Sequence, residues 1–323
     1  NIFEVKLCDF TKEDSTDAEA AKYLVSDADK SSVTISDVIG AEDARERMQK
    51  YVKFLKDPDG YRLSGAKPSK GILLYGPPGT GKTMLAKALA SEADCPFIAV
   101  SGADFLSDDP QTPSIKKVFS IAKQYSPAVV FNDEIDAFAR PREERGITKL
   151  VNQLLTEMDG FSTDESKPVY VVAATNAGGK HNLSGENINL DAAVLRRFSD
   201  RCYVGLPGRR AMEEYLKMKV EKLSKTKGIA TDRIASFNIE ETAYSAISYD
   251  MSLSDMDTIF NSILSDKYLD NDDDPISNEE IITAMEQYKM GPETLPDRKD
   301  KYFDAEEHQE KLQKLKASLL ITA

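Results

Sequence analysis

The sequence has few residues of the kinds that bind soft metals or cross-link chains. Its 323 residues include no tryptophan, two histidines and three cysteines. Cys8, Cys95 and Cys202 are odd in number and far apart, which is typical of reduced thiols in a cytoplasmic protein and not of a disulfide framework. Because His181 and His308 are the only histidines, the sequence argues against a histidine-rich metal site, and we expect no zinc.

Long apolar runs and a basic surface are also missing. No run approaches the ~20 apolar residues that a membrane-spanning helix needs, so we expect no membrane segment in this chain. The formal net charge is −13, whereas nucleic-acid binders usually present a basic surface that displaces counterions from phosphates. This charge therefore argues against a nucleic-acid partner.

The pattern of the remaining sequence divides the chain into four parts. Residues 1–32 are polar and predict an N-terminal extension or linker. Over residues 33–206, short apolar runs alternate with helical stretches, which predicts a doubly wound α/β domain with a parallel five-stranded sheet. Residues 207–293 predict a small all-helical lid domain, and residues 294–323 a helical tail.

The strand candidates are continuous apolar runs, as expected where helices cover both faces of a sheet. They are Gly71–Gly76, Phe97–Gly102, Ala128–Asp133, Tyr170–Asn176 and Arg201–Leu206. Helices are expected at Lys82–Glu92, Ser114–Gln124, Thr148–Asp159, Arg209–Ser224, Ser252–Lys267 and Ile276–Lys289. Capping boxes of Ser252 with Asp255 and Ser277 with Glu280 are expected to start the last two. Such sheets bind ligands at the carboxyl ends of their strands.

The most specific motif lies between the first strand and the next helix. Residues 76–83 read G-P-P-G-T-G-K-T and match the phosphate-binding pattern G-x-x-x-x-G-K-[ST]. The glycines let backbone N–H groups converge on phosphate oxygens, and the helix N-terminus adds partial positive charge. We expect Lys82 to reach the β- and γ-phosphates of ATP and Thr83 to ligate Mg²⁺. The expected nucleotide contacts are Pro78, Gly79, Thr80, Gly81, Lys82, Thr83 and Met84.

Two adjacent acids end the third strand candidate. Asp133 is expected in the Mg²⁺ shell, and Glu134 is expected to polarise the attacking water. Two acids at a strand end are often merely solvated. Their position downstream of a phosphate-binding loop favours a catalytic role.

With these motifs the sequence resembles the classical clade of AAA+ ATPases, and within it the ATPase module of FtsH-type metalloproteases. The resemblance extends from about Val33 to Glu293 and is most specific in FLKDP (54–58), GAKPSKGILLYGPPGTG (65–81), DEIDA (133–137) and NQLLTEMDGF (152–161). It implies a homo-oligomeric ring, a hexamer, that binds ATP or ADP with Mg²⁺ at each subunit boundary. It also implies a protein substrate or partner.

The resemblance implies roles for further residues. Asn176 corresponds to sensor 1, which positions the lytic water, although an Asn after a strand can also be a turn residue. Arg196 and Arg197 correspond to the arginine-finger segment that reaches the neighbouring subunit's γ-phosphate. The usual Pro-Gly between two such arginines is absent, so the pair is more similar to that of katanin-like proteins. The segment whose backbone holds adenine corresponds to Asp37, Val38, Ile39 and Gly40, with a hydrophobic helix lead-in as the alternative.

Three departures from the family pattern bear on function. The expected substrate-gripping loop, 106–113, has no aromatic residue and contains two prolines, which argues against ordinary threading of polypeptide. No H-E-x-x-H peptidase motif occurs, so we expect no peptidase activity from this chain. Asn132 replaces an apolar residue before the paired acids, and Leu253 with Ser254 replaces a small Gly-Ala pair, changes that could slow hydrolysis. The loop 177–189 is also longer than the family pattern.

These features favour a Mg²⁺-dependent AAA+ ring ATPase that remodels or disassembles a protein partner without proteolysis. Two alternatives stay open. One is the ATPase portion, or a degenerate member, of an FtsH-type ATP-dependent zinc metalloprotease. The other is an ATP-dependent scaffold or switch with little turnover.

Overall fold

The computed structural model describes residues 33–65, 69, 71–106, 114–140, 145–160, 168–176, 188, 190–225, 237–269 and 274–290. The predicted extension 1–32, the tail 294–323, the segment 107–113 and most of the loop 177–189 lie outside these residues. The chain forms two compact units, one of Asn1–Pro77 with Gly81–Gly205 and one of Pro78–Thr80 with Leu206–Ala323. The domain boundaries at residues 32, 206 and 293 stay predictions. Within the described ranges, no helix is long and apolar enough to cross a membrane.

A five-stranded parallel sheet forms the centre of the first unit, as predicted. Its strands are β1 (Gly71–Tyr75), β2 (Phe97–Ser101), β3 (Ala128–Asp133), β4 (Val169–Thr175) and β5 (Asp200–Tyr203), in the order β2-β3-β4-β1-β5. β3 has the predicted bounds, whereas β5 begins one residue earlier than expected and ends three residues earlier. Pro207 has no N–H to donate, which is consistent with the chain leaving the sheet before it.

The strand order places the ends of β1, β3 and β4 side by side. β1 lies between β4 and β5, with Tyr75 opposite both Thr175 and Tyr203. β3 lies between β2 and β4, with Asn132 opposite Val100 and Ala173. Because all these pairings are parallel, the loops that follow β1, β3 and β4 emerge at one edge of the sheet.

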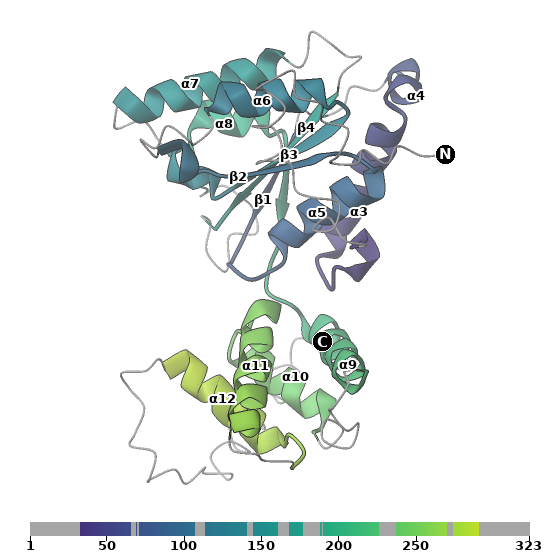
Figure 1. Ribbon diagram of the computed structural model, residues 1–323, viewed down its shortest axis with the longest axis vertical. Coiled ribbons are helices and arrows are strands. Elements are labelled where there is room, and N and C mark those ends of the chain that lie inside the picture. The colour runs from purple at the N-terminus through teal and green to yellow at the C-terminus, as the bar shows by residue number, and fades with distance from the viewer. Residues whose placement is uncertain are drawn as a thin grey trace, which may run out of the picture. The chain divides into compact units, whose positions relative to one another are not determined.

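Helices cover both faces of the sheet (Figure 1). α3 (Glu42–Lys56) and α5 (Lys82–Ala93) lie on one face, and α6 (Ile115–Gln124), α7 (Arg145–Gly160) and α8 (Ala192–Arg197) on the other. Shorter elements are η1 (Ile35–Asp37), α4 (Pro58–Leu63), η2 (Asp104–Leu106) and η3 (Ile135–Ala137). α3, α4 and α8 were not among the predicted helices.

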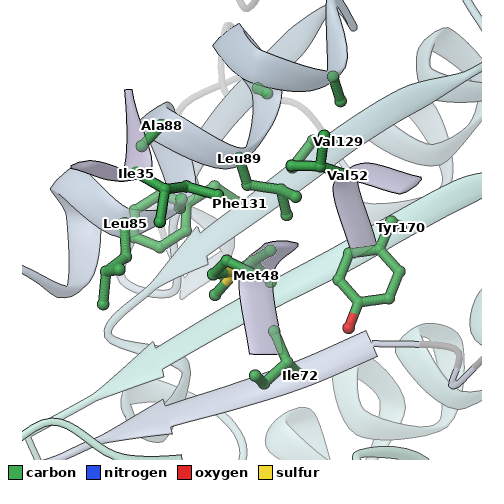
Figure 2. Packing of buried hydrophobic residues seen from close by; sticks show 14 of the residues in the cluster. Ile35, Met48, Val52, Ile72, Leu85, Ala88, Leu89, Val129, Phe131 and Tyr170 are labelled. Atoms are coloured by element: carbon green, nitrogen blue, oxygen red, sulfur yellow. The ribbon is translucent and has the colours of Figure 1, made fainter. Parts of the chain in front are cut away.

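The packing of α3 and α5 fixes the helix that starts at Lys82. Figure 2 shows Met48 of α3 and Leu85 and Leu89 of α5 gathered over Ile72 and Phe131 of the sheet. All of these side chains are at most 2% exposed. Burial of apolar surface on this scale holds α5 in one position against the strands.

A polar network joins α3 to the edge strand β5. Arg47 and the Tyr51 hydroxyl both donate to the carboxylate of Asp200. Arg47 Nε also donates to Asp43 Oδ2 at 3.0 Å, and the Cys202 thiol donates to the same oxygen at 3.3 Å. Burial, with the Asp43 carboxylate beside it, raises the pKa of Cys202 to about 12, so the thiol stays protonated and unreactive.

The second unit is helical, as predicted. Its described helices are α9 (Arg209–Ser224), α10 (Ile239–Ser248), α11 (Leu253–Leu269) and α12 (Asn278–Met290), of which α10 was not predicted. Both predicted capping boxes are confirmed. Ser252 N donates to Asp255 Oδ2 at 2.8 Å and Asp255 N donates back to Ser252 Oγ at 3.1 Å. The corresponding distances for Ser277 and Glu280 are 2.6 and 3.2 Å.

The packing of the core between α3, α5 and the sheet predicts that truncating a buried side chain there lowers the free energy of unfolding. Leu89→Ala removes a side chain that is 0% exposed, and we expect it to lower the free energy of unfolding by about 2 to 5 kcal/mol. Leu63→Ala is the control, because Leu63 is 84% exposed and should change stability by less than about 0.5 kcal/mol. Urea unfolding followed by circular dichroism measures both, and equal stabilities of the two variants would contradict the packing.

Candidate functional site

The phosphate-binding loop connects β1 to α5 and contains three glycines with positive φ angles, Gly76, Gly79 and Gly81. Gly76 and Gly81 have φ angles of 146° and 92°, which other residues rarely adopt. A Cβ on Gly76 would also lie 2.2 Å from the carbonyl oxygen of Val204. Among the other predicted loop contacts, Pro78 and Gly79 are exposed, Thr80 is buried and Met84 is 38% exposed.

Lys82 is the first residue of α5, and its side chain folds back into the loop. Its Nζ donates to the carbonyl oxygens of Gly76 at 3.0 Å and Pro77 at 2.7 Å. Burial lowers the pKa of Lys82 to about 8, although the charges of Asp133 and Asp136 act in the opposite direction. A phosphate in the loop would give this ammonium a charged partner in place of two neutral carbonyls.

Thr83 and Asp133 meet although they are 50 residues apart in sequence. Thr83 Oγ1 donates to Asp133 Oδ2 at 3.2 Å, and Glu134 N donates to Asp133 Oδ1 at 2.9 Å. Mg²⁺ prefers hard oxygen ligands and is usually held by one or two protein groups together with phosphates and water. The hydroxyl of Thr83 and the carboxylate of Asp133 therefore fit a Mg²⁺ ion.

Glu134 follows β3 in a left-handed backbone conformation, with φ 50° and ψ 43°. For a residue with a side chain this conformation costs about 1 to 3 kcal/mol and is concentrated at functional sites. Gly102 supports the turn: its N–H donates to Asp133 O at 2.7 Å, and a Cβ there would lie 2.3 Å from Glu134 O. The Glu134 side chain is exposed at the sheet edge.

Asn176 lies directly after β4 and is exposed. The preceding Thr175 is 1% exposed and contacts two neighbouring segments at the sheet edge, among other interactions. Its carbonyl oxygen accepts from Gly76 N at 3.3 Å, and its hydroxyl donates to Asp136 Oδ1 at 2.6 Å. Thr175, Asp136 and Gly102 were not predicted, because their contacts depend on strand order and no spacing in the sequence reveals them.

Asn132 is buried beside the two acids. It is 3% exposed, and its Oδ1 has no hydrogen-bond partner within the described residues. A buried acceptor without a partner costs about 1 to 3 kcal/mol, and ordered water is the usual remedy.

The two arginines at the end of α8 have different surroundings. Arg197 Nε and Nη2 donate to the two carboxylate oxygens of Asp159 at 2.8 and 2.7 Å, which raises the pKa of Arg197. Arg196 is exposed. In the part of the chain that the structure describes, no hydrogen bond or ion pair joins either arginine to Lys82 or Glu134.

The predicted adenine segment is fixed by its own contacts. Asp37 Oδ2 accepts from the N–H and the hydroxyl of Thr34, both at 2.7 Å, and these bonds lower the pKa of Asp37. Val38 is 2% exposed in the core. These two side chains therefore serve the fold, which leaves the backbone, Ile39 and Gly40 as the groups that could face a base.

Comparison with known proteins agrees with this geometry. Residues 72–206 match the family described as "ATPase family associated with various cellular activities (AAA)". Residues 18–122 also match the "TIP49 P-loop domain".

Curated relatives extend the similarity beyond these residues. ATP-dependent zinc metalloprotease FtsH 2 of Methylacidiphilum infernorum is 40% identical over 64% of this chain and 32% of its own length. FtsH 1 of a Thermoanaerobacter species is 42% identical over 65% of this chain and 33% of its own. FtsH of Caldicellulosiruptor bescii is 37% identical over 82% of this chain and 41% of its own. The similarity thus covers 32% to 41% of the length of these relatives. Over residues 72–206 this chain carries an AAA ATPase domain, and it is homologous to the ATPase region of FtsH proteins.

Proposed function

We propose that this chain hydrolyses ATP with Mg²⁺ and uses the energy to remodel or disassemble a protein partner, without peptidase activity of its own. The observation that carries the proposal is the convergence of Lys82, Thr83 and Asp133 at one sheet edge, with Glu134 next to them. These groups supply a phosphate ligand, two hard oxygen ligands and a general base.

Each residue has a separate task in this reaction. Lys82 donates to phosphate oxygens, and Thr83 and Asp133 hold the Mg²⁺, which when bound offsets charge on the phosphates. Glu134 accepts a proton from the water whose oxygen bonds to the γ-phosphorus, as the bond between that phosphorus and the oxygen of ADP breaks. The products are ADP and inorganic phosphate. Asn176 donates a hydrogen bond that orients the water.

We further propose that the active form is a homo-oligomeric ring, a hexamer, with sites shared between subunits. Arg196 supports this, because it is exposed and has no hydrogen-bond or ion-pair partner among the described residues. Arg197 is already held by Asp159 and stabilises the end of α8. We place the ring in the cytoplasm, because its three cysteines are odd in number and far apart in sequence, as is typical of proteins of a reducing compartment.

A second candidate is the ATPase step of an FtsH-type zinc metalloprotease. The relatives support it, because they are named ATP-dependent zinc metalloproteases and one matches 82% of this chain. An ATPase rate that rises on addition of unfolded casein would favour this second function. A rate that casein leaves unchanged would favour a dedicated partner.

The role of Glu134 is tested by Glu134→Gln. Because the amide cannot accept the proton, we expect turnover to fall by about 100-fold or more while ATP stays bound. Glu279→Gln is the control, since Glu279 is an exposed acid at the start of α12 and should leave turnover unchanged. A coupled ATPase assay and binding of a fluorescent ATP analogue give both values. Unchanged turnover in Glu134→Gln would rule out Glu134 as the base, whereas ATP binding without turnover in the unaltered chain would favour the scaffold alternative.

The sharing of sites is tested by Arg196→Ala, which should lower turnover by about 1,000-fold without weakening ATP binding. Mixing this variant with Glu134→Gln should restore part of the activity, because a subunit with intact Glu134 then receives Arg196 from its neighbour. Arg210→Ala, at an exposed arginine of α9, is the control. Absence of any recovery in the mixture would contradict a shared site.

A further inference from the structure

Thr175 contacts the phosphate-binding loop and the turn after β3, and it directly precedes Asn176. Its carbonyl oxygen accepts from Gly76 N, the first residue of the phosphate-binding loop, at 3.3 Å. Its hydroxyl donates to Asp136 Oδ1, in the turn after β3, at 2.6 Å. Asn176 is the next residue, directly after β4. One buried side chain therefore contacts the turn that starts at Glu134, while its backbone joins β4 to the loop.

A backbone hydrogen bond and two buried side chains fix the conformation of the turn between Glu134 and Asp136. The backbone of Glu134 accepts from Ala137 N at 2.9 Å within the η3 turn. Ile135 and Phe138 are 0% exposed and anchor the turn in the core. A displacement of Asp136 would therefore also displace Glu134.

Within the described residues, the Asp136 carboxylate contacts Thr175 and Arg140, and the hydrogen bond to Thr175 is the stronger contact. The other carboxylate oxygen lies 3.8 Å from Nη2 of Arg140, whose side chain is 61% exposed, so that ion pair is screened by solvent. Thr175 is 1% exposed and the Asp136 side chain is 21% exposed, so the hydroxyl donates to a partly buried carboxylate in a charge-assisted hydrogen bond.

We propose that Thr175 and Asp136 are positioning residues whose hydrogen bond sets the spacing between Glu134 and Asn176. This inference rests on the proposed ATP hydrolysis, which assigns both of those groups to the attacking water. Neither positioning residue touches the nucleotide in this account. Loss of the bond therefore slows turnover and leaves nucleotide binding in place.

The test replaces the hydroxyl in the full chain. Thr175→Val is close in shape but cannot donate, and we expect it to lower kcat by about 10- to 100-fold, the scale of a small misplacement of catalytic groups. The Kd of a fluorescent ATP analogue should stay within about twofold, as expected when an interaction acts on the reaction and not on binding. Thr175→Ser keeps the hydroxyl and should stay within about threefold of the original kcat.

Thr242→Val is the matched control. Thr242 is 0% exposed, and its hydroxyl donates to Asn278 Oδ1 at 3.3 Å in the helical unit. It should change kcat little while it reproduces the general effect of removing a buried hydroxyl. Asp136→Ala, which also removes the solvent-screened ion pair to Arg140, should lower kcat at least as much as Thr175→Val. The double variant should lose no more than Asp136→Ala, because both single changes remove the same hydrogen bond.

Three results would overturn the inference while the unaltered chain still hydrolyses ATP. One is a kcat in Thr175→Val equal to that of Thr242→Val, and another is an equal loss in Thr175→Ser and Thr175→Val. The third is a loss of nucleotide affinity in proportion to the loss of turnover. Absence of turnover in the unaltered chain, at any protein concentration with Mg-ATP, would overturn the proposed function and this inference with it.

Discussion

The insertion of β1 between β4 and β5 is the constraint on which the rest of the site depends. With the order β2-β3-β4-β1-β5, the loop after β1 emerges beside the ends of β4 and β3, although β3 and β4 end about 60 and 100 residues later in the chain. The apolar packing of α3 and α5 holds this arrangement from one face, and α6, α7 and α8 hold it from the other. Charged and polar groups can then be concentrated at one edge, because the buried sheet behind them is rigid.

Two residues assigned to the proposed chemistry, Glu134 and Lys82, have unfavourable local conformations or surroundings at the sheet edge. Glu134 has a left-handed backbone, and Gly102 packs against its carbonyl with no space for a side chain. Lys82 is buried with two carbonyl partners and a pKa lowered to about 8. Conflicts between local preference and global fold are expected to gather at functional sites. Their concentration around one loop agrees with the matched AAA family at residues 72–206.

Much of the fold could be predicted from the sequence, because its strands are continuous apolar runs and its helices carry recognisable caps. Ala128–Asp133 and Arg209–Ser224 have the predicted bounds, and both capping boxes are present. α10 was not predicted; its buried positions are small or polar, such as Thr242 and Ser245, and present no run of large apolar side chains. The phosphate-binding loop could be predicted from the spacing of its glycines and Lys82. The hydrogen-bonded pairs Thr175–Asp136 and Arg197–Asp159 join segments that are distant in sequence, so only the structure reveals them.

The central claim is that the site hydrolyses ATP when subunits complete one another's sites. Its most direct test measures the steady-state ATPase rate per subunit against protein concentration, with mass determined by light scattering in the same samples with and without ATP. We expect the rate per subunit to rise as the mass increases from monomer to ring. A monomer that binds ATP and does not turn it over at any concentration, or one that hydrolyses ATP at a constant rate per subunit without assembling, would contradict it.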